Sequence, residues 1–449
     1  MLAHDARAAT YEVGPRQPLA NLGAVPWEKL LPGDTVLIHA RNEPYREKFV
    51  ICRAGKPDAP ITVRGVPDAA GRRPVISGDG ATTRPELQYW GDVRSVIKIG
   101  GAVNPPDTTP QHIVIENLEV CGARPPYTFT NAAGQRQNYT KNAAAITVEK
   151  AEHLTIRNCV LRDSGNGLFI SSNDQQVSRD ILVTGNHIFD NGTAKSGLEH
   201  NVYSAGIRLV FEYNRFGPLR PGCLGNALKD RSAGLVVRYN WIEGGNRELD
   251  LVDAEDSALI RRDPGYRETF VYGNVILKLP TDLHSFVVHY GGDSPRPDNY
   301  RKGTLHFFHN TIVSYRPTMT MLFWLSSTAE RCEFRNNLVH LTSPKAKLTL
   351  LKDVGNLHLD HNWLPPGWKN SFSTTPKAVV TGAETGLGGA APGFMNLAAQ
   401  DFRLTAASPC RDAGAGKSVE RQYVLHQSSA ARRDDGKPDL GAFEFGGKE

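Results

Sequence analysis

A short pattern of alternating apolar and polar residues returns nine times along the chain. Seven copies share one form: apolar, any residue, apolar, two variable residues, Asn, any residue, apolar. Their asparagines are Asn186, Asn214, Asn240, Asn274, Asn310, Asn337 and Asn362, at spacings of 28, 26, 34, 36, 27 and 25 residues. Alternation of this kind is the periodicity of a β-strand. Its return at this interval predicts a β-solenoid, in which one coil follows another.

The repeated asparagine supports the solenoid independently of the apolar residues. Asn is unfavourable in strands, so its return at one place in every coil needs a physical reason. Stacked amide side chains can bond to the coil above and the coil below, as they do in cross-β ladders. Two earlier copies carry Asn117 and Asn158 one place earlier in the motif.

A second series of short strands lies between these copies. It reads AAITVEK, NGLFISS, HNVYSAG, NALKDRS, RELDLVD, SFVVHYG, MLFWLSS and LTLLKD. Insertions lengthen the coils at Pro105–Asn142, Asn191–His200, Ala254–Tyr266 and Asp293–Lys302. In repeat proteins such insertions commonly gather on one face and build the binding site.

The whole chain is expected to form one all-β domain. Its 449 residues exceed the size of a usual globular core, but a solenoid coil needs only its neighbours to bury its inner face. We predict an N-terminal cap and first strand over residues 1–40, coils over 41–375, and a C-terminal cap over 376–449 that packs on the last coils. An open solenoid edge invites pairing with other chains, and Leu19–Leu31 could form a short amphipathic capping helix there.

Composition excludes several classes of protein. No apolar run reaches 18 residues, so no membrane span is expected. The net charge of +5 suits an acidic partner such as a uronate polysaccharide, and equally an ordinary soluble protein. No Lys/Arg-rich segment or nucleic-acid-binding motif is present, so nucleic acid is not an expected partner. None of the six cysteines lies in a CxxC pair, which argues against zinc.

The opening residues PGDTVLIHARNEPYREKFVI, then KPDAPITVRG and PVISGDG, resemble the first coils of right-handed parallel β-helix proteins of the pectate-lyase and chondroitinase B/alginate lyase kind. The ending DFRLTAASPCRDAG with KPDLGAFEF is similar to the close of bacterial β-helix proteins. The resemblance implies a right-handed helix and an exported polysaccharide lyase, periplasmic or secreted, that acts as a monomer. The first residues lack the apolar segment of a signal peptide, so the chain is expected to be a mature form.

Several motifs of related families are missing. The paired-aspartate and GHG motifs of polygalacturonases are not found, and neither is the DPHD motif of mannuronan epimerases. The calcium-and-base pattern of chondroitinase B is incomplete. The substrate therefore stays open.

Stacking the second strand series predicts one row of outward side chains. With Ile146, Leu168, Val202, Leu228 and Leu249 on one inner line, the next residues point outward. This outward row reads Thr147, Phe169, Tyr203, Lys229 and Asp250. The residue before each inner position is also expected to point outward, which adds Asn201 and Glu248. Adjacent strands lie about 4.8 Å apart, so Tyr203 to Asp250 would span roughly 10 Å.

This row suits β-elimination of a uronate glycoside. Such a reaction needs a cation for the sugar carboxylate, a base for the neighbouring proton and an acid for the departing oxygen. Lys229 could be the base if burial and Arg231 lower its pKa, and Arg231 could bind the carboxylate. Tyr203 or His200 could be the acid. Further expected substrate contacts are Asn201, Asn226, Glu248, Asp250 and His289.

Three alternatives to this interpretation remain. Glu248, Asp250 and Asp253 could bind Ca²⁺, a cofactor that would neutralise the uronate. Glu248 and Asp250 could instead act as the acid and base of a glycoside hydrolase. A third possibility is a non-catalytic scaffold that binds glycans through exposed aromatic residues. Lys229 and Asp250 would then form only an exposed ion pair between coils, which contributes little to stability.

Overall fold

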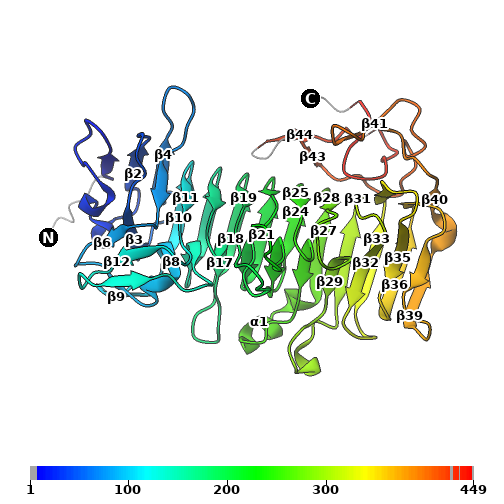
Figure 1. The fold of residues 1–449 in the computed structure, drawn as a ribbon, viewed down its shortest axis with the longest axis horizontal. Coiled ribbons are helices and arrows are strands. Elements are labelled where there is room, and N and C mark those ends of the chain that lie inside the picture. Colours follow the sequence, from blue (N-terminus) through cyan, green and yellow to red (C-terminus); the bar gives the residue numbers. More distant parts are fainter. Residues whose placement is uncertain (1–7, 425–427, 434, 447–449) are drawn as a thin grey trace.

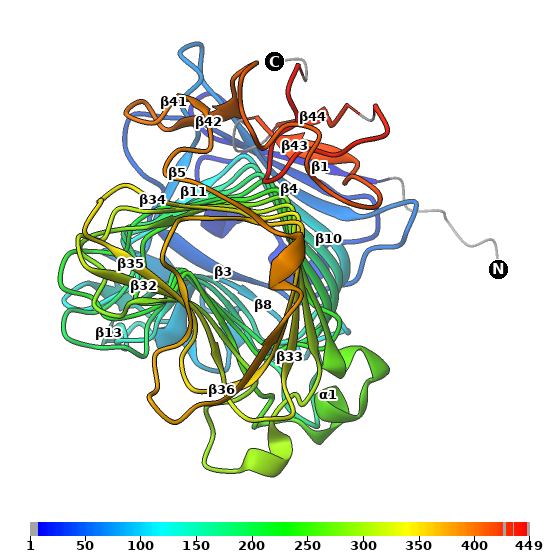
Figure 2. The ribbon, with the colours of Figure 1, turned by 90° about the vertical axis from the view of Figure 1, so that its right-hand side faces the viewer.

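The computed structural model describes residues 8–424, 428–433 and 435–446. The chain forms a right-handed parallel β-helix whose coils succeed one another along the long axis (Figure 1). A complete coil contributes one strand to each of three parallel sheets, which surround an apolar interior (Figure 2). The predicted fold class is therefore confirmed.

We call these three sheets sheet 1, sheet 2 and sheet 3, in the order in which the chain passes through them in each coil. Sheet 1 contains β1 (Thr10–Val13), β2 (Thr35–His39), β4 (Ile61–Val66), β10 (Gln111–Glu116), β15 (Glu152–Arg157), β18 (Arg179–Thr184), β21 (Ile207–Glu212), β24 (Val236–Arg238), β27 (Glu268–Tyr272), β30 (Thr304–Phe308), β33 (Arg331–Arg335), β36 (Val354–Asp360) and β39 (Lys377–Thr381). Sheet 2 contains β5 (Val75–Ser77), β11 (Glu119–Cys121), β16 (Val160–Arg162), β19 (His187–Phe189), β22 (Arg215–Phe216), β25 (Trp241–Glu243), β28 (Val275–Lys278), β31 (Thr311–Ser314), β34 (Leu338–Leu341), β37 (Trp363–Leu364) and β40 (Leu387–Gly388).

Sheet 3 carries the second strand series of the sequence. It contains β3 (Glu47–Ile51), β6 (Ala81–Thr83), β8 (Ser95–Ile99), β12 (Thr128–Thr130), β13 (Arg136–Asn138), β14 (Ala144–Val148), β17 (Asn166–Ile170), β20 (Val202–Ser204), β23 (Leu228–Asp230), β26 (Leu249–Leu251), β29 (Phe286–Tyr290), β32 (Met319–Leu325), β35 (Lys347–Leu351) and β38 (Lys369–Ser371). Within this sheet β12 and β13 pair in the antiparallel sense.

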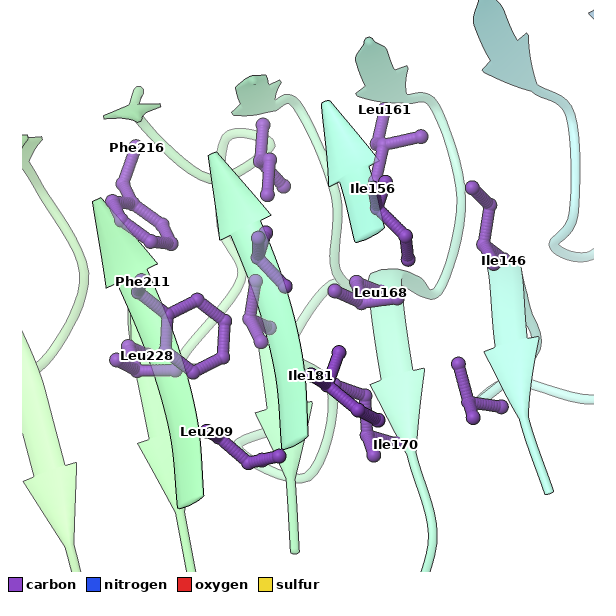
Figure 3. Packing of buried hydrophobic residues seen from close by; sticks show 14 of the residues in the cluster. Ile146, Ile156, Leu161, Leu168, Ile170, Ile181, Leu209, Phe211, Phe216 and Leu228 are labelled. Atoms are coloured by element: carbon purple, nitrogen blue, oxygen red, sulfur yellow. The ribbon is translucent and has the colours of Figure 1, made fainter. Parts of the chain in front are cut away.

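The interior is a stack of aliphatic side chains in which each coil lies on the next. Ile146, Leu168 and Leu228 of sheet 3 are fully buried and follow one another along the axis (Figure 3). They face Ile156 and Phe211 of sheet 1 across the interior. Burial of each such side chain contributes roughly 1.5–3 kcal/mol, so every added coil stabilises its neighbours.

The repeated asparagines form a continuous buried ladder at the corner between sheets 1 and 2. From Asn186 to Asn337, each side-chain amide donates to the Oδ1 atom of the asparagine in the next coil, at 2.9–3.1 Å. The ladder was predicted, but these residues lie in the bend rather than within a strand. Cys159 occupies the ladder position one coil before Asn186, and its backbone N–H donates to Asn186 Oδ1.

The residue before each ladder asparagine has a left-handed backbone. Tyr213, Tyr239 and His309 have φ values of 55°, 54° and 52° there. Asn117 and Asn158, with φ of 59° and 55°, occupy this same position in their own coils. Asn tolerates left-handed backbone better than most residues, which explains why these two asparagines lie one place earlier in the motif.

The N-terminal end is closed by two short 3-10 turns. These are η1 (Leu22–Ala24) and η2 (Trp27–Lys29), within the segment where a capping helix was predicted. The Trp27 ring stacks on Phe49 with ring centroids 3.8 Å apart, and both side chains are buried. The turns therefore cover the apolar end of the first coils.

The C-terminal part differs from the expected boundary at residue 375. Strands β39 and β40 continue the helix, so the coils reach Gly388. The tail then returns along the outer face of sheet 2 (Figure 1) and contains the antiparallel pairs β41 (Phe394–Asn396) with β42 (Asp401–Leu404) and β43 (Arg421–Tyr423) with β44 (Ser429–Ala431). Phe402 and Phe443 of the tail pack on Val275 and Val313 of sheet 2.

The long insertions lie beside sheet 3. The hairpin β12–β13 and residues 191–200 precede strands β14 and β20 of that sheet. Two further insertions follow β26 and β29, and they contain α1 (Ala258–Arg262), η4 (Pro264–Arg267) and η5 (Pro297–Asn299). The tail covers later strands of sheet 2, whereas the insertions adjoin strands of sheet 3. Among the described residues, no helix is long and apolar enough to cross a membrane.

Candidate active site

One row of side chains crosses the outer face of sheet 3, in the predicted register. Strand pairing places these residues next to one another in order: Thr147, Phe169, Tyr203, Lys229, Asp250, His289 and Trp324. We call this row the sheet 3 lane. Lys352 follows β35 directly and lies over Trp324, which extends the lane by one position.

Charged groups of alternating sign connect the middle of the lane. Arg231 Nε donates to the Tyr203 hydroxyl at 2.8 Å, and Arg231 Nη2 lies 3.0 Å from Asp293 Oδ1. The other oxygen of Asp293 bonds to Lys229 Nζ. Lys229 Nζ also donates to Asp250 Oδ2 at 3.0 Å. The phenol and both cations therefore belong to one hydrogen-bonded chain.

Asp250 is the buried anchor of this chain. Its side chain is 1% exposed and accepts hydrogen bonds from Lys229 Nζ and, at 2.9 Å, from Asn226 Nδ2. Its Oδ1 lies 2.8 Å from His289 Nδ1. Burial alone would raise the pKa of Asp250, but Lys229 and His289 outweigh burial and hold the pKa well below its usual range. Asp250 is therefore ionised at neutral pH.

Lys229 is a cation, contrary to the prediction that burial and Arg231 would lower its pKa. Burial does act in that direction, but the carboxylates of Asp250 and Asp293 outweigh it and raise the pKa above its usual value. An ammonium group has three N–H donors, and these two carboxylates use two of them. Lys229 thus cannot serve as the base, but it can donate to an anion from its side chain, which is 11% exposed.

The guanidinium nitrogens of Arg231 are all engaged by other groups of the protein. Besides Tyr203 and Asp293, its guanidinium contacts Glu255 Oε1 at 2.9 Å and the backbone oxygen of Asp253. Its side chain is 6% exposed. Burial would lower its pKa, but its electrostatic interactions with Tyr203, Asp293 and Glu255 raise it. Arg231 therefore orients Tyr203 and Asp293 rather than offering a free fork to a substrate.

Tyr203 remains protonated at neutral pH. Burial raises its pKa, and Arg231 and Lys229 only partly counter this effect. The phenol oxygen accepts the N–H of Arg231, so its own hydrogen is free to point elsewhere. A cavity of about 60 Å³ opens beside the ring, between Tyr203, Phe169 and Ile260. The site thus offers a protonated phenol that a ligand can approach.

His200 lies under the lane and does not carry a positive charge. Its Nδ1 accepts the backbone N–H of Asn226 at 2.9 Å, and its ring is 5.8 Å from that of Tyr203. Burial, with a smaller contribution from Lys229, lowers its pKa to about 3. The neutral ring supports Tyr203 from beneath. This agrees with strand alternation, because His200 lies two positions before the inward-facing Val202.

The predicted contacts Asn201 and Asn226 face the protein. Asn201 is fully buried, and its side chain bonds to Asn191 and the Gly217 carbonyl. The expectation that it points outward is wrong, because the chain is already turning into the corner between sheets 2 and 3. Asn226 is 3% exposed and holds Asp250 in place.

Glu248 is also not part of the lane. It was predicted to point outward, yet it is fully buried and lies 3.2 Å from Lys278 Nζ, itself also fully buried. Burial raises the pKa of Glu248 well above its usual value, and Lys278 only partly opposes this effect. The Glu248–Asp250 pair expected for a glycoside hydrolase therefore does not form, because Glu248 precedes β26 and its carboxyl group pairs with Lys278, whereas that of Asp250 pairs with Lys229.

The expected calcium ligands are likewise separated. Glu248 faces Lys278, Asp250 faces Lys229, and Asp253 Oδ1 accepts the backbone N–H of Asp293 at 2.8 Å. Within the part of the chain that the structure describes, no group of three His, Cys, Asp or Glu side chains could hold a metal ion. The donor set does not fit Ca²⁺, because the three carboxylates face different groups of the protein, even though Glu248 Oε2 and Asp253 Oδ2 have no hydrogen-bond partner among the described residues.

Reasoning from the sequence did not identify Asp293, Ser326 and Arg247. Asp293 begins a predicted insertion, and only folding brings it against Lys229 and Arg231. Ser326 Oγ lies 3.0 Å from His289 Nε2, so neither ring nitrogen of that histidine is left for a substrate. Arg247 lies 3.5 Å from Asp250 at the edge of the lane. The position of Asp293 in an insertion beside sheet 3 was the one available signal.

No protein-family model matches the chain, and no curated protein matches it. Among solved structures, pectate lyase Pel9A is similar at 15% identity and a TM-score of 0.52, over 97% of this chain and 96% of that one. An alginate lyase from Paenibacillus sp. str. FPU-7 is 13% identical over 83% of this chain and 98% of its own, with a TM-score of 0.45. XylC in complex with xylose is 11% identical over 83% and 86%, with a TM-score of 0.46. The likeness to Pel9A agrees with the parallel β-helix fold.

Proposed function

We propose that this protein is a polysaccharide lyase that cleaves an acidic, uronate-containing polysaccharide by β-elimination at the sheet 3 lane. The supporting observation is the adjacency of Tyr203 and Lys229 in neighbouring coils. One is a protonated phenol and the other a cation with an N–H donor to spare. Polymer substrates of this kind are met outside the cytoplasm, which is consistent with an exported protein.

Lys229 neutralises the uronate carboxylate in this proposal. Its third N–H bonds to the sugar carboxylate, which makes the proton on C5 more acidic. Asp293 is 29% exposed and already contacts Lys229, so it is placed to take that proton. Burial would raise the pKa of Asp293, but Lys229 and Arg231 outweigh burial and lower it.

Tyr203 completes the elimination. As the C5–H bond breaks, its electron pair forms the C4=C5 double bond and the C4–O4 bond breaks. The hydroxyl proton of Tyr203 passes to O4 of the departing sugar. Asp293 now carries the proton from C5 and returns it through solvent to the phenolate, which restores both groups.

The charge states favour elimination over hydrolysis. A glycoside hydrolase needs a protonated carboxyl group beside the scissile bond. The pKa values of Asp250 and Asp293, the two carboxylates bonded to Lys229, are both lowered by the cations around them. Glu248 has a raised pKa but is sealed beneath the surface with Lys278. Tyr203 is therefore the proton donor at this site.

The test is a panel of alginate, pectate, glycosaminoglycans and bacterial exopolysaccharides, followed by the ultraviolet absorbance of the unsaturated product. We expect one acidic polymer to give that absorbance, and Tyr203→Phe to lower its rate about 10²–10⁴-fold, the usual contribution of a general acid. Tyr213→Phe is the matched control, because Tyr213 lies in the bend after β21, away from the lane. New reducing ends without absorbance would indicate a hydrolase, and binding without cleavage a scaffold; either result contradicts the proposal.

A further inference from the structure

The far end of the sheet 3 lane carries two cations that lie over an aromatic ring. Lys352 Nζ lies 3.7 Å from the centroid of the Trp324 ring, and the Arg247 guanidinium lies 5.1 Å from the same centroid. Phe286 packs beside Trp324 with ring centroids 5.4 Å apart. We call Arg247, Phe286, Trp324 and Lys352 the Trp324 cluster.

The two cations differ from Lys229 and Arg231 in their partners. Among the described residues, the ammonium group of Lys352 makes no hydrogen bond or ion pair, and the carboxylate partner of Arg247 is Asp250 at 3.5 Å. The buried Nε of Arg247 has no hydrogen-bond partner there either. Lys352 has no carboxylate partner among the described residues, and Arg247 has one that it shares with Lys229 and His289. Both are therefore expected to attract an anion more readily than Lys229 and Arg231, each of which contacts at least two carboxylates.

His284, whose ring centroid lies 6.3 Å from that of Phe286, is subject to the same cations. Burial lowers the pKa of His284, and Arg247, Lys278 and Arg316 lower it further. Burial also lowers the pKa of Lys352; Asp353 opposes this lowering, and Arg247 adds a smaller lowering. Arg316 at the edge of this region bonds to backbone oxygens of Met319 and His284.

The position of the cluster fits a polymer that also reaches Lys229. Trp324 lies three strand positions from Lys229 along the lane. At about 4.8 Å per strand this is about 14 Å, a span of roughly two or three sugar residues. A polymer lying across the strands would thus place one sugar at Lys229 and a later one at Trp324.

We propose that the Trp324 cluster is an anion-binding subsite for a uronate residue two or three sugars away from the one at Lys229. The inference deepens the proposed function, because it assumes that an acidic polysaccharide lies along the lane. Lys352 and Arg247 bind the sugar carboxylate, while the edges of Trp324 and Phe286 contact the sugar ring. The subsite makes a long acidic chain bind more tightly than a short or a neutral one.

The competing explanation is that Lys352 only covers the Trp324 ring, a cation–π contact worth about 0.5–1 kcal/mol at an exposed site. Three variants separate the two. Lys352→Met keeps an unbranched apolar stem on the ring and removes the charge, whereas Lys352→Arg keeps the charge. Lys347→Met is the matched control, because Lys347 is an exposed lysine of the same strand, β35, away from the lane.

The experiment measures dissociation constants by calorimetry for oligomers of galacturonate and of mannuronate, about six sugars and two sugars long. All proteins carry Tyr203→Phe so that the probes stay intact. A neutral xylose oligomer of the longer length is the probe control. Lys352→Met should raise the dissociation constant of a long acidic oligomer about tenfold, the loss of one charge-assisted hydrogen bond. Lys352→Arg and Lys347→Met should leave it within about twofold.

The outcomes distinguish this inference from the proposed function. Equal effects of Lys352→Met and Lys347→Met, equal binding of acidic and neutral oligomers, or no acidic binding at all would each overturn the subsite. Binding that depends on Lys352 in a protein whose parent gives no unsaturated product supports the subsite and refutes the lyase. Cleavage by the parent, together with oligomer binding that does not depend on Lys352, supports the lyase and refutes the subsite.

Discussion

Replacing Asp250 by Asn tests the charge network of the site. The side chain is 1% exposed, and its carboxylate accepts hydrogen bonds from Lys229 and Asn226 and pairs with His289. Removing one partner of a buried ion pair costs about 3–5 kcal/mol. Asn keeps one acceptor oxygen and Lys229 keeps Asp293, so we expect a loss of about 3 kcal/mol at pH 7.

The same variant should show a defined pH dependence. The folded pKa of Asp250 is depressed, so its stabilising contribution is fully present above the unfolded pKa of about 3.9 and is lost as the pH falls below it. The difference between parent and variant should shrink by up to about 1.4 kcal/mol per pH unit in that range.

The assay is urea denaturation of both proteins at pH 7 and pH 3. The control is Asp180→Asn, because Asp180 pairs with Arg208 on the surface and such pairs are worth about 0–1 kcal/mol. A loss at Asp250 no larger than at Asp180, or a difference that is the same at both pH values, would refute the description of Asp250 as a buried ionised anchor.

Two further results are expected. Asn240→Ala removes an amide whose Oδ1 accepts both the backbone and side-chain N–H of Asn214 and whose Nδ2 donates to the Phe211 carbonyl. Losing these three buried hydrogen bonds should lower the free energy of unfolding by about 2–6 kcal/mol, measured by urea denaturation. Asn370→Ala, at an exposed position of β38, should change stability by less than about 0.5 kcal/mol; a similar loss in both would argue against the ladder as a source of stability. Treatment with a chelator should leave lyase activity unchanged, because the expected calcium ligands bind groups of the protein; loss of activity that calcium restores would contradict this.

The lane could be predicted because strand periodicity is a local property. The side chains of a strand alternate between faces, and parallel coils stack in register, so the positions of Tyr203, Lys229 and Asp250 follow from the apolar pattern. The same rule failed for Asn201 and Glu248. Both residues lie just before the first residue of a strand, where the backbone is still turning through a corner and the alternation does not determine the direction of the side chain.

Charge states could not be predicted, because they depend on partners distant in the sequence. Asp293 lies 64 residues from Lys229, yet its carboxylate helps to keep that lysine charged. No periodicity relates an insertion to the strand it folds against. The role of Lys229 therefore changed from base to cation only when the tertiary structure was known.

The sequence by itself determined the architecture of this protein: stacked coils, an asparagine ladder and an outward row on one strand series. Those features repeat coil after coil, and nearest-neighbour stacking is enough to specify them. The tertiary structure alone decided the chemistry of that row. How many carboxylates each lane cation contacts depends on single loops, each of which occurs once in the chain and carries no repeat from which its contacts could be inferred.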